Sequence, residues 1–138
     1  MVKGEFMIIK EVLTYDGDNY AQFIVSDGTY DLLCVCTPVT LPSGFNEPKK
    51  GMDISEIVAF APDGMNVKRI RDDKNKVYMI KKGKNPLNYH LQSKVIDKEI
   101  GLVRIGNLII ETDELPEDVV NGDFIEFEVD RLDCDFDS

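Results

Sequence analysis

The sequence has 138 residues, of which 43% are hydrophobic and 30% charged. That size and composition fit one folded domain and exclude a disordered chain. No apolar run approaches the length of a transmembrane helix, and the first ten residues lack the basic start and apolar stretch of a signal peptide. The three cysteines are an odd number and a poor disulfide framework, so we expect a cytoplasmic protein without a membrane partner.

Most of the chain alternates apolar and polar residues with a period of two, which predicts strands. Asp27-Gly28 marks a hairpin turn, the proline-containing segment 37–51 a long loop, and residues 115–120 one helical turn. No segment has the pattern of a long amphipathic helix. We therefore expect a small all-β barrel or sandwich. The expected strands are 6–12, 20–26, 30–35, 54–60, 67–71, 77–81, 87–96, 102–105, 108–112 and 124–130.

The last strand has the clearest alternation. Ile125, Phe127 and Val129 occupy one face, and the acidic residues between them occupy the other. The apolar set then changes phase by one residue, to Leu132, Cys134 and Phe136. Such a change predicts a bulge or the end of the strand after residue 130.

A weak internal repeat suggests that the chain is a duplication. The pattern of strand, turn, strand, Leu-Pro loop, glycine and strand occurs twice, with Gly51 corresponding to Gly122. We expect one compact unit, residues 1–138, with a first repeat in 1–66, a basic hairpin connector in 67–86 and a second repeat in 87–138. Five-stranded Greek-key barrels of the OB type are an analogy of shape for each half. The matching pairs are Gln22/Gln92, Val25/Val95, Asp27/Asp97, Leu32/Leu102, Gly51/Gly122, Ile54/Ile125 and Val58/Val129.

Catalytic and metal-binding signals are weak. His90 is the single histidine, and no nucleophile elbow or phosphate-binding loop accompanies it. Cys34 and Cys36 share one face of a strand, but with Cys134 they form no pattern typical of a metal site. The acidic row near the C-terminus lacks the glycine and final glutamate of a calcium-binding loop. We expect no enzymatic activity, no cofactor and no metal site.

The net charge of −10 is unevenly distributed. Residues 1–66 carry 4 basic and 10 acidic side chains, residues 67–98 carry 10 and 3, and residues 99–138 carry 2 and 13. The middle segment is therefore basic between two acidic ones, and each sign suggests a different partner.

The acidic C-terminal third favours a protein-binding module for a partner with a basic surface, such as an inhibitor, immunity or adaptor protein. This is the leading hypothesis. Its candidate binding residues are Glu111, Asp113, Glu114, Glu126, Glu128 and Asp130.

The basic hairpin supports an alternative, an OB-like binder of single-stranded nucleic acid, because cations and an aromatic ring suit phosphates and bases. The same residues also fit a purely structural role, in which lysines protect an edge strand of the sheet from aggregation. A third alternative is a structural subunit of a homo-oligomer. The candidate nucleic-acid residues are Lys68, Arg69, Arg71, Lys74, Lys76, Tyr78, Lys81 and Lys82.

Overall fold

The protein is built from β-strands. The computed structural model describes residues 7–136; 51% of the chain is strand, and the described residues contain no α-helix. The prediction of an all-β fold is confirmed. Phe6, in the first expected strand, lies outside the described residues. The strands are β1 (Ile8–Asp16), β2 (Tyr20–Ser26), β3 (Asp31–Cys36), β4 (Ile54–Phe60), β5 (Lys68–Ile70), β6 (Met79–Lys82), β7 (Tyr89–Asp97), β8 (Leu102–Ile105), β9 (Leu108–Glu111), β10 (Phe124–Val129) and β11 (Arg131–Phe136).

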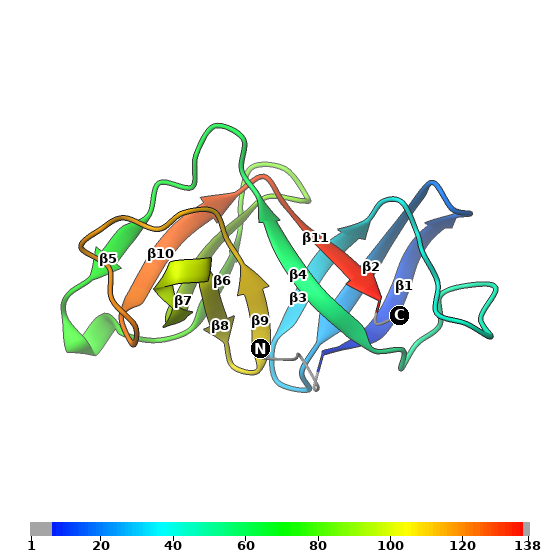
Figure 1. Cartoon of the computed structure of the whole chain (residues 1–138), viewed down its shortest axis with the longest axis horizontal. Helices are drawn as coiled ribbons and strands as arrows, with labels where there is room; N and C mark the ends of the chain where they lie inside the picture. Colours follow the sequence, from blue (N-terminus) through cyan, green and yellow to red (C-terminus); the bar gives the residue numbers. More distant parts are fainter. Residues whose placement is uncertain (1–6, 137–138) are drawn as a thin grey trace.

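All eleven strands belong to one mixed open sheet, with the order β1-β2-β3-β11-β4-β9-β8-β7-β10-β5 and β6 also paired to β7. Of the expected barrel or sandwich, the closed barrel is therefore wrong. Alternation in a sequence shows which face of a strand is buried, but it does not show how the edges of a sheet meet. β11 pairs parallel to β3 and β4 parallel to β9, while the other pairs are antiparallel. Figure 1 shows β4 and β11 crossing the middle of the molecule.

The hairpin predicted at Asp27-Gly28 is confirmed. β2 and β3 pair antiparallel across this turn, and the Asp27 carboxylate accepts hydrogen bonds from the amides of Thr29 and Tyr30 at 2.8 and 2.7 Å. Gly28 has a φ of 94°, a value that favours glycine. The segment between β3 and β4 has no strand, as expected of a long loop. The helical turn expected at residues 115–120 is absent, and the Val119 amide instead donates to the Pro116 carbonyl across a tight turn.

The predicted phase change between β10 and β11 is confirmed. Ile125, Phe127 and Val129 are buried, whereas Glu128 and Asp130 on the opposite face are exposed. β10 ends at Val129, and β11 begins at Arg131 with the buried set shifted by one residue. The chain therefore passes from one pair of neighbouring strands to another at Asp130.

The expected basic hairpin does not form. β5 pairs with β10, and β6 pairs with β7, so the two strands that flank the short 3-10 turn η1 (Asp73–Asn75) do not pair with each other. Lys68 lies opposite Glu126 in the β5–β10 register. Opposite charges across a strand pair are favourable, and this pairing is not local. The turn residues of the segment therefore indicated a reversal of the chain but not the partner of each strand.

Gly51 and Gly122 have the same backbone arrangement. Their φ values are 93° and 92°, and each amide donates at 2.8 Å, Gly51 to Ile9 in β1 and Gly122 to Val95 in β7. The glycines therefore make β1 the counterpart of β7, whereas the sequence matches aligned β2 with β7. The matches at that offset do not follow the register of the sheet, and the duplication itself stays a prediction.

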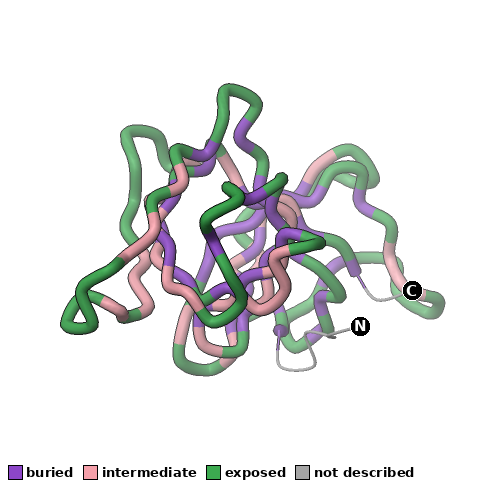
Figure 2. Tube along the Cα trace, turned by 60° about the vertical axis from the view of Figure 1, so that its left-hand side comes forward, coloured by how far each residue is buried: buried purple, intermediate pink, exposed green. Residues whose placement is uncertain are grey.

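One continuous core runs through the molecule, and Figure 2 shows buried segments in its interior and exposed ones in the outer loops. The three cysteines belong to it and are all buried. Its largest fully buried side chains include Phe23 and Phe127, one from each half of the chain. The side chains available for binding are therefore those on the outer faces of the strands and in the loops.

Candidate functional site

Two of the acidic candidates contact the only histidine. Glu126 and Glu128 project from the outer face of β10, and His90 projects from the neighbouring strand β7. The His90 Nε2 atom lies 3.2 Å from Glu126 Oε2, and its Nδ1 atom lies 3.4 Å from Glu128 Oε1. These two carboxylates are therefore partly engaged within the sheet. Asp130 is exposed beside them, where β10 ends.

The other three acidic candidates lie at the end of β9 and in the loop after it. Glu111 is the last residue of β9, and Asp113 and Glu114 are exposed. Both loop residues line a hollow of about 430 Å³, together with residues 64–67 and 115–117. The six candidates thus divide between two regions, one along β10 and one at the end of β9 with the loop that follows, instead of forming one acidic face.

The structure assembles a different acidic group, the carboxylate trio of Glu56, Glu111 and Asp135. Asp135 in β11 lies directly opposite Glu56 in β4, and Glu111 in β9 lies beside Val58 of β4. Partial loss of water around its carboxylate raises the pKa of Glu56, although the residue as a whole is exposed. The negative charges of Glu111 and Asp135 and a hydrogen bond with Asp135 raise it further. Within residues 7–136, none of the three makes a salt bridge.

The sequence did not single out Glu56 or place Asp135 beside it. Glu56 and Asp135 are 79 positions apart in the chain, and Glu56 and Glu111 are 55 apart. They meet only because β4 pairs with both β11 and β9. No local pattern reports that pairing. The alternation of β4 could have predicted that Glu56 lies on the outer face, but not which strands lie beside it.

Among the described residues, three of the seven basic candidates form salt bridges with acids, and a fourth, Lys68, lies opposite Glu126 in the β5–β10 register. Arg69 lies 2.9 Å from Asp123, and Lys76 lies 2.8 Å from Asp73. A third pair, Arg71 with Asp118, is looser at 3.9 Å. Arg69 and Arg71 therefore contact the acidic C-terminal third. These pairs reduce the charge that the segment presents to a phosphate backbone.

The remaining basic candidates point in different directions. Lys81 and Lys82 alternate along β6, so their side chains project to opposite faces of it, and Lys74 is exposed in the η1 turn. The Tyr78 ring packs against those of Tyr30 and Phe124, with centroids 5.7 and 5.6 Å away. A ring enclosed in this way makes a poor platform for stacking bases.

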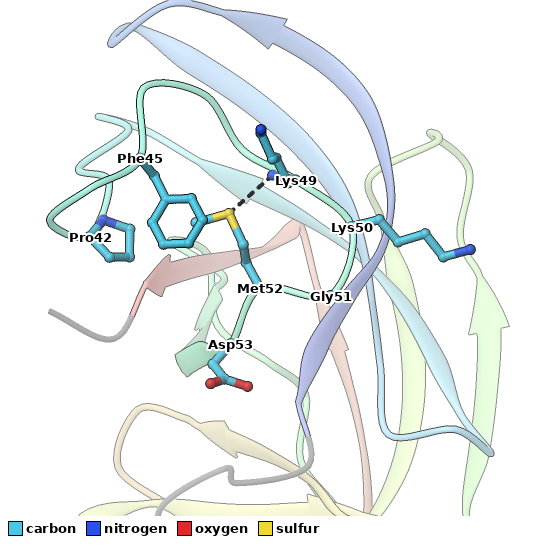
Figure 3. Close-up of a pocket in the computed structure, with 7 residues that line it drawn as sticks. All are labelled: Pro42, Phe45, Lys49, Lys50, Gly51, Met52 and Asp53. Atoms are coloured by element: carbon cyan, nitrogen blue, oxygen red, sulfur yellow. Dashed lines mark hydrogen bonds between the residues drawn. The ribbon is translucent and has the colours of Figure 1, made fainter.

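A hollow of about 490 Å³ lies under the long loop between β3 and β4, and the sequence did not predict it. Figure 3 shows the Phe45 ring beside the Met52 side chain, with Pro42 close by. The Lys49 amide donates to Met52 Sδ at 3.1 Å and holds the loop over this site. Phe45 is nevertheless 46% exposed. Lysines and Asp53 share the lining, so no single charge dominates it.

The cysteines are packed together in the core. Cys134 contacts both Cys34 and Cys36, because β11 pairs parallel with β3 at Asp133 and Val35. The contact with Cys134 and burial raise the pKa of the Cys36 thiol far above its ordinary value, so the thiolate is disfavoured. Among residues 7–136, no group of three or more histidine, cysteine, aspartate or glutamate side chains could hold a metal ion.

No helix in the described part of the chain is long and apolar enough to cross a membrane. Set against known protein families, curated proteins and solved structures, the chain matches none of them.

Proposed function

We propose that this protein is a non-enzymatic protein-binding module that docks a basic surface of its partner against the carboxylate trio of Glu56, Glu111 and Asp135. The proposal is carried by the position of these three groups on adjacent strands. Burial there, and then the negative charges of Glu111 and Asp135, raise the pKa of Glu56. Like charges held together cost free energy, and a lysine or arginine from a partner would relieve that cost.

Apolar side chains beside the trio support a docking role. Val58, which lies between Glu111 and Asp133 in the strand register, is partly exposed, as is Ile109 of β9. Phe60 is 39% exposed, and the Arg131 guanidinium lies 4.2 Å from the centre of its ring. An apolar centre with charged residues around it is the usual arrangement of a protein interface.

The sheet also supports the proposed internal duplication. β1-β2-β3 and β7-β8-β9 are antiparallel meanders, and each is followed by a strand that begins after a hydrogen-bonded glycine, Gly51 or Gly122. The third strand of each meander then pairs parallel, β3 with β11 and β9 with β4. β4 therefore corresponds to β10 and β11 taken together, since β10 follows the glycine and β11 makes the parallel pair. The trio lies where β4 pairs with β11 and β9.

A pull-down from the native lysate, with nuclease added, tests the proposal. The bait is compared with a trio variant, Glu56→Gln, Glu111→Gln and Asp135→Asn. The charge-matched control variant neutralises three exposed carboxylates elsewhere, by the substitutions Asp16→Asn, Glu47→Gln and Asp63→Asn. The proposal expects a basic protein on the wild type and the control variant but not on the trio variant. Equal capture by all three, or no captured protein at all, would contradict it.

The nucleic-acid alternative has less support, because Arg69, Arg71 and Lys76 are paired with acids and the Tyr78 ring is enclosed. A homo-oligomer would need complementary surfaces on two copies. The carboxylate trio repels an identical trio, so a two-fold contact through this face is unfavourable. A different basic protein is therefore the partner that the trio favours.

A further inference from the structure

A second hollow, of about 330 Å³, lies between the outer face of the β1-β2-β3 meander and strands β6 and β7. Ile24 of β2, Leu33 of β3 and Ile80 of β6 supply its apolar lining. Ile24 and Leu33 face each other in the β2–β3 register, so they form one continuous apolar patch. Ile80 approaches this patch from the other half of the chain.

The two sides of this hollow are joined by a buried hydrogen bond. The Leu33 amide donates to the Tyr89 hydroxyl at 2.8 Å, and Tyr89 is only 4% exposed. β6 in turn is fixed to β7 by their antiparallel pairing, which places Lys82 opposite Tyr89. The hollow therefore has a preformed shape, as ligand sites usually do.

One cation at the hollow is held in place without being neutralised. The Lys82 ammonium donates to the Pro86 carbonyl at 2.9 Å and lies 4.6 Å from the centre of the Tyr89 ring. Neither partner carries a full negative charge, and no carboxylate within residues 7–136 forms a salt bridge with Lys82. The other lysine at the site differs, because Lys10 is paired with Asp31 at 2.7 Å.

We propose that this hollow binds a small organic monoanion with a compact apolar body, such as an aryl or branched-chain carboxylate. The carboxylate meets the ammonium of Lys82, and the apolar body covers Ile24, Leu33 and Ile80. The volume is near the lower end of the range for ligand sites, which fits a single ring and not a nucleotide. Glu11 also lines the hollow and disfavours a second negative charge. This site is separate from the carboxylate trio.

Phenylacetate and its neutral analogue phenylacetamide test the proposal by protein NMR. We expect phenylacetate to shift the backbone amide signals of Ile24, Leu33 and Ile80, with a dissociation constant on the order of 1–10 mM for a ligand of this size. Phenylacetamide should bind about fivefold more weakly, which is the contribution of one exposed ion pair. A spectrum without such shifts, or equal binding of the two probes, overturns the proposal.

Lys82→Gln and Lys81→Gln provide the matched pair of variants. Both residues lie on β6, but Lys81 projects to the face opposite the hollow. Lys82→Gln should weaken phenylacetate binding about fivefold and leave phenylacetamide binding unchanged. Lys81→Gln should bind both probes as the wild type does. If the two variants lose the same affinity, the anion is responding to the overall charge of β6 and the proposed site is wrong.

Discussion

The Asp27 carboxylate accepts a hydrogen bond at 2.7 Å from the backbone amide of Asn107, 80 positions further along the chain. Asp27 lies in the turn between β2 and β3, and Asn107 in the turn between β8 and β9. The same carboxylate accepts from the amides of Thr29 and Tyr30 within its own turn. One side chain therefore shapes the first hairpin and joins it to the second.

Replacing Asp27 should destabilise the protein in a pH-dependent way. Burial alone would raise the pKa of Asp27, but the amides of Tyr30, Asn107 and Thr29 hold it below its ordinary value. The stabilisation is therefore present above the unfolded-state pKa and is lost as the pH falls through the folded-state pKa. We expect Asp27→Asn to lower the free energy of unfolding by about 1–3 kcal/mol at pH 7.

Urea unfolding between pH 7 and pH 3 checks this. The difference between wild type and Asp27→Asn should shrink at the acid end of the range. Asp63→Asn, in an exposed turn, is the control and should match the wild type. A gap that stays constant with pH would show that the charge of Asp27 is irrelevant.

Gly101→Ala should cost much more stability than Gly17→Ala. The two glycines have φ values of 68° and 55°, so an alanine at either bears a conformational cost of about 1 kcal/mol. A Cβ at Gly101 would also lie 2.5 Å from the Thr112 carbonyl oxygen, whereas one at Gly17 would have no atom within 4 Å. We expect a further loss of about 1–3 kcal/mol at Gly101, measured by urea unfolding. Equal losses of stability in the two variants would mean that the backbone at Thr112 moves away from the new Cβ at no cost in free energy.

Ser93→Ala should leave the stability unchanged or raise it. The Ser93 side chain is completely buried, and its hydroxyl has no hydrogen-bond partner among the described residues. Removing an unpaired buried hydroxyl recovers up to about 1–2 kcal/mol of desolvation free energy. Ser26→Ala is the contrast, because the buried Ser26 hydroxyl accepts from the Gly28 amide at 3.0 Å, and its loss should cost about 1 kcal/mol. In thermal unfolding, Ser93→Ala should leave the melting temperature unchanged or raise it, whereas Ser26→Ala should lower it.

Glu56→Gln should stabilise the protein at neutral pH. Because the folded-state pKa of Glu56 is raised, the wild type is relatively more stable below the unfolded-state pKa and loses that stability as the pH rises through the folded-state value. The gain should be less than about 1 kcal/mol, because the side chain is exposed and solvent screens its charge. Urea unfolding at pH 7 and pH 4 should show the gain only at pH 7. High salt should reduce it, and a loss at pH 7 would contradict the like-charge argument.

Generic single-stranded oligonucleotides should bind no tighter than about 10 μM at physiological salt. The overall charge of −10 opposes contact, and Arg69 and Arg71 are engaged by acids of the C-terminal third. Fluorescence anisotropy with labelled oligonucleotides measures the affinity, with the double variant Lys74→Glu and Lys76→Glu for comparison. Submicromolar binding that disappears in the double variant would make the basic segment the functional site.

The parts of the fold that depend on local pattern could be predicted from the sequence. The alternation of β10, the phase change at Asp130 and the turn at Asp27-Gly28 are each encoded within a few neighbouring residues. The pairing of strands is not encoded in this way. Two basic strands on either side of a turn predict a hairpin, but β5 pairs with β10 and β6 pairs with β7.

The candidate site, too, depends partly on local sequence and partly on strand pairing that the sequence does not show. The crowding of acidic residues near the C-terminus predicts Glu111 as a candidate, but Glu56 lies in residues 1–66, where 10 acidic side chains are spread along the segment. The two meet through the parallel pairing of β4 with β9, and Asp135 joins them through the antiparallel pairing of β4 with β11. Charge counts along the sequence therefore identified Glu111 as a candidate, but they could not predict the strand pairings that bring Glu56 and Asp135 beside it.

The position of β11 between β3 and β4 affects how the chain is made. During synthesis, β3 and β4 leave the ribosome before β11, and roughly 70 residues separate the end of β4 from the start of the strand that joins them. At usual translation rates that interval is on the order of 4–14 s. For that time the two strands present unpaired edges, which are prone to wrong pairing with other chains. The N-terminal half therefore depends for its pairing on β11, a strand that is translated well after it.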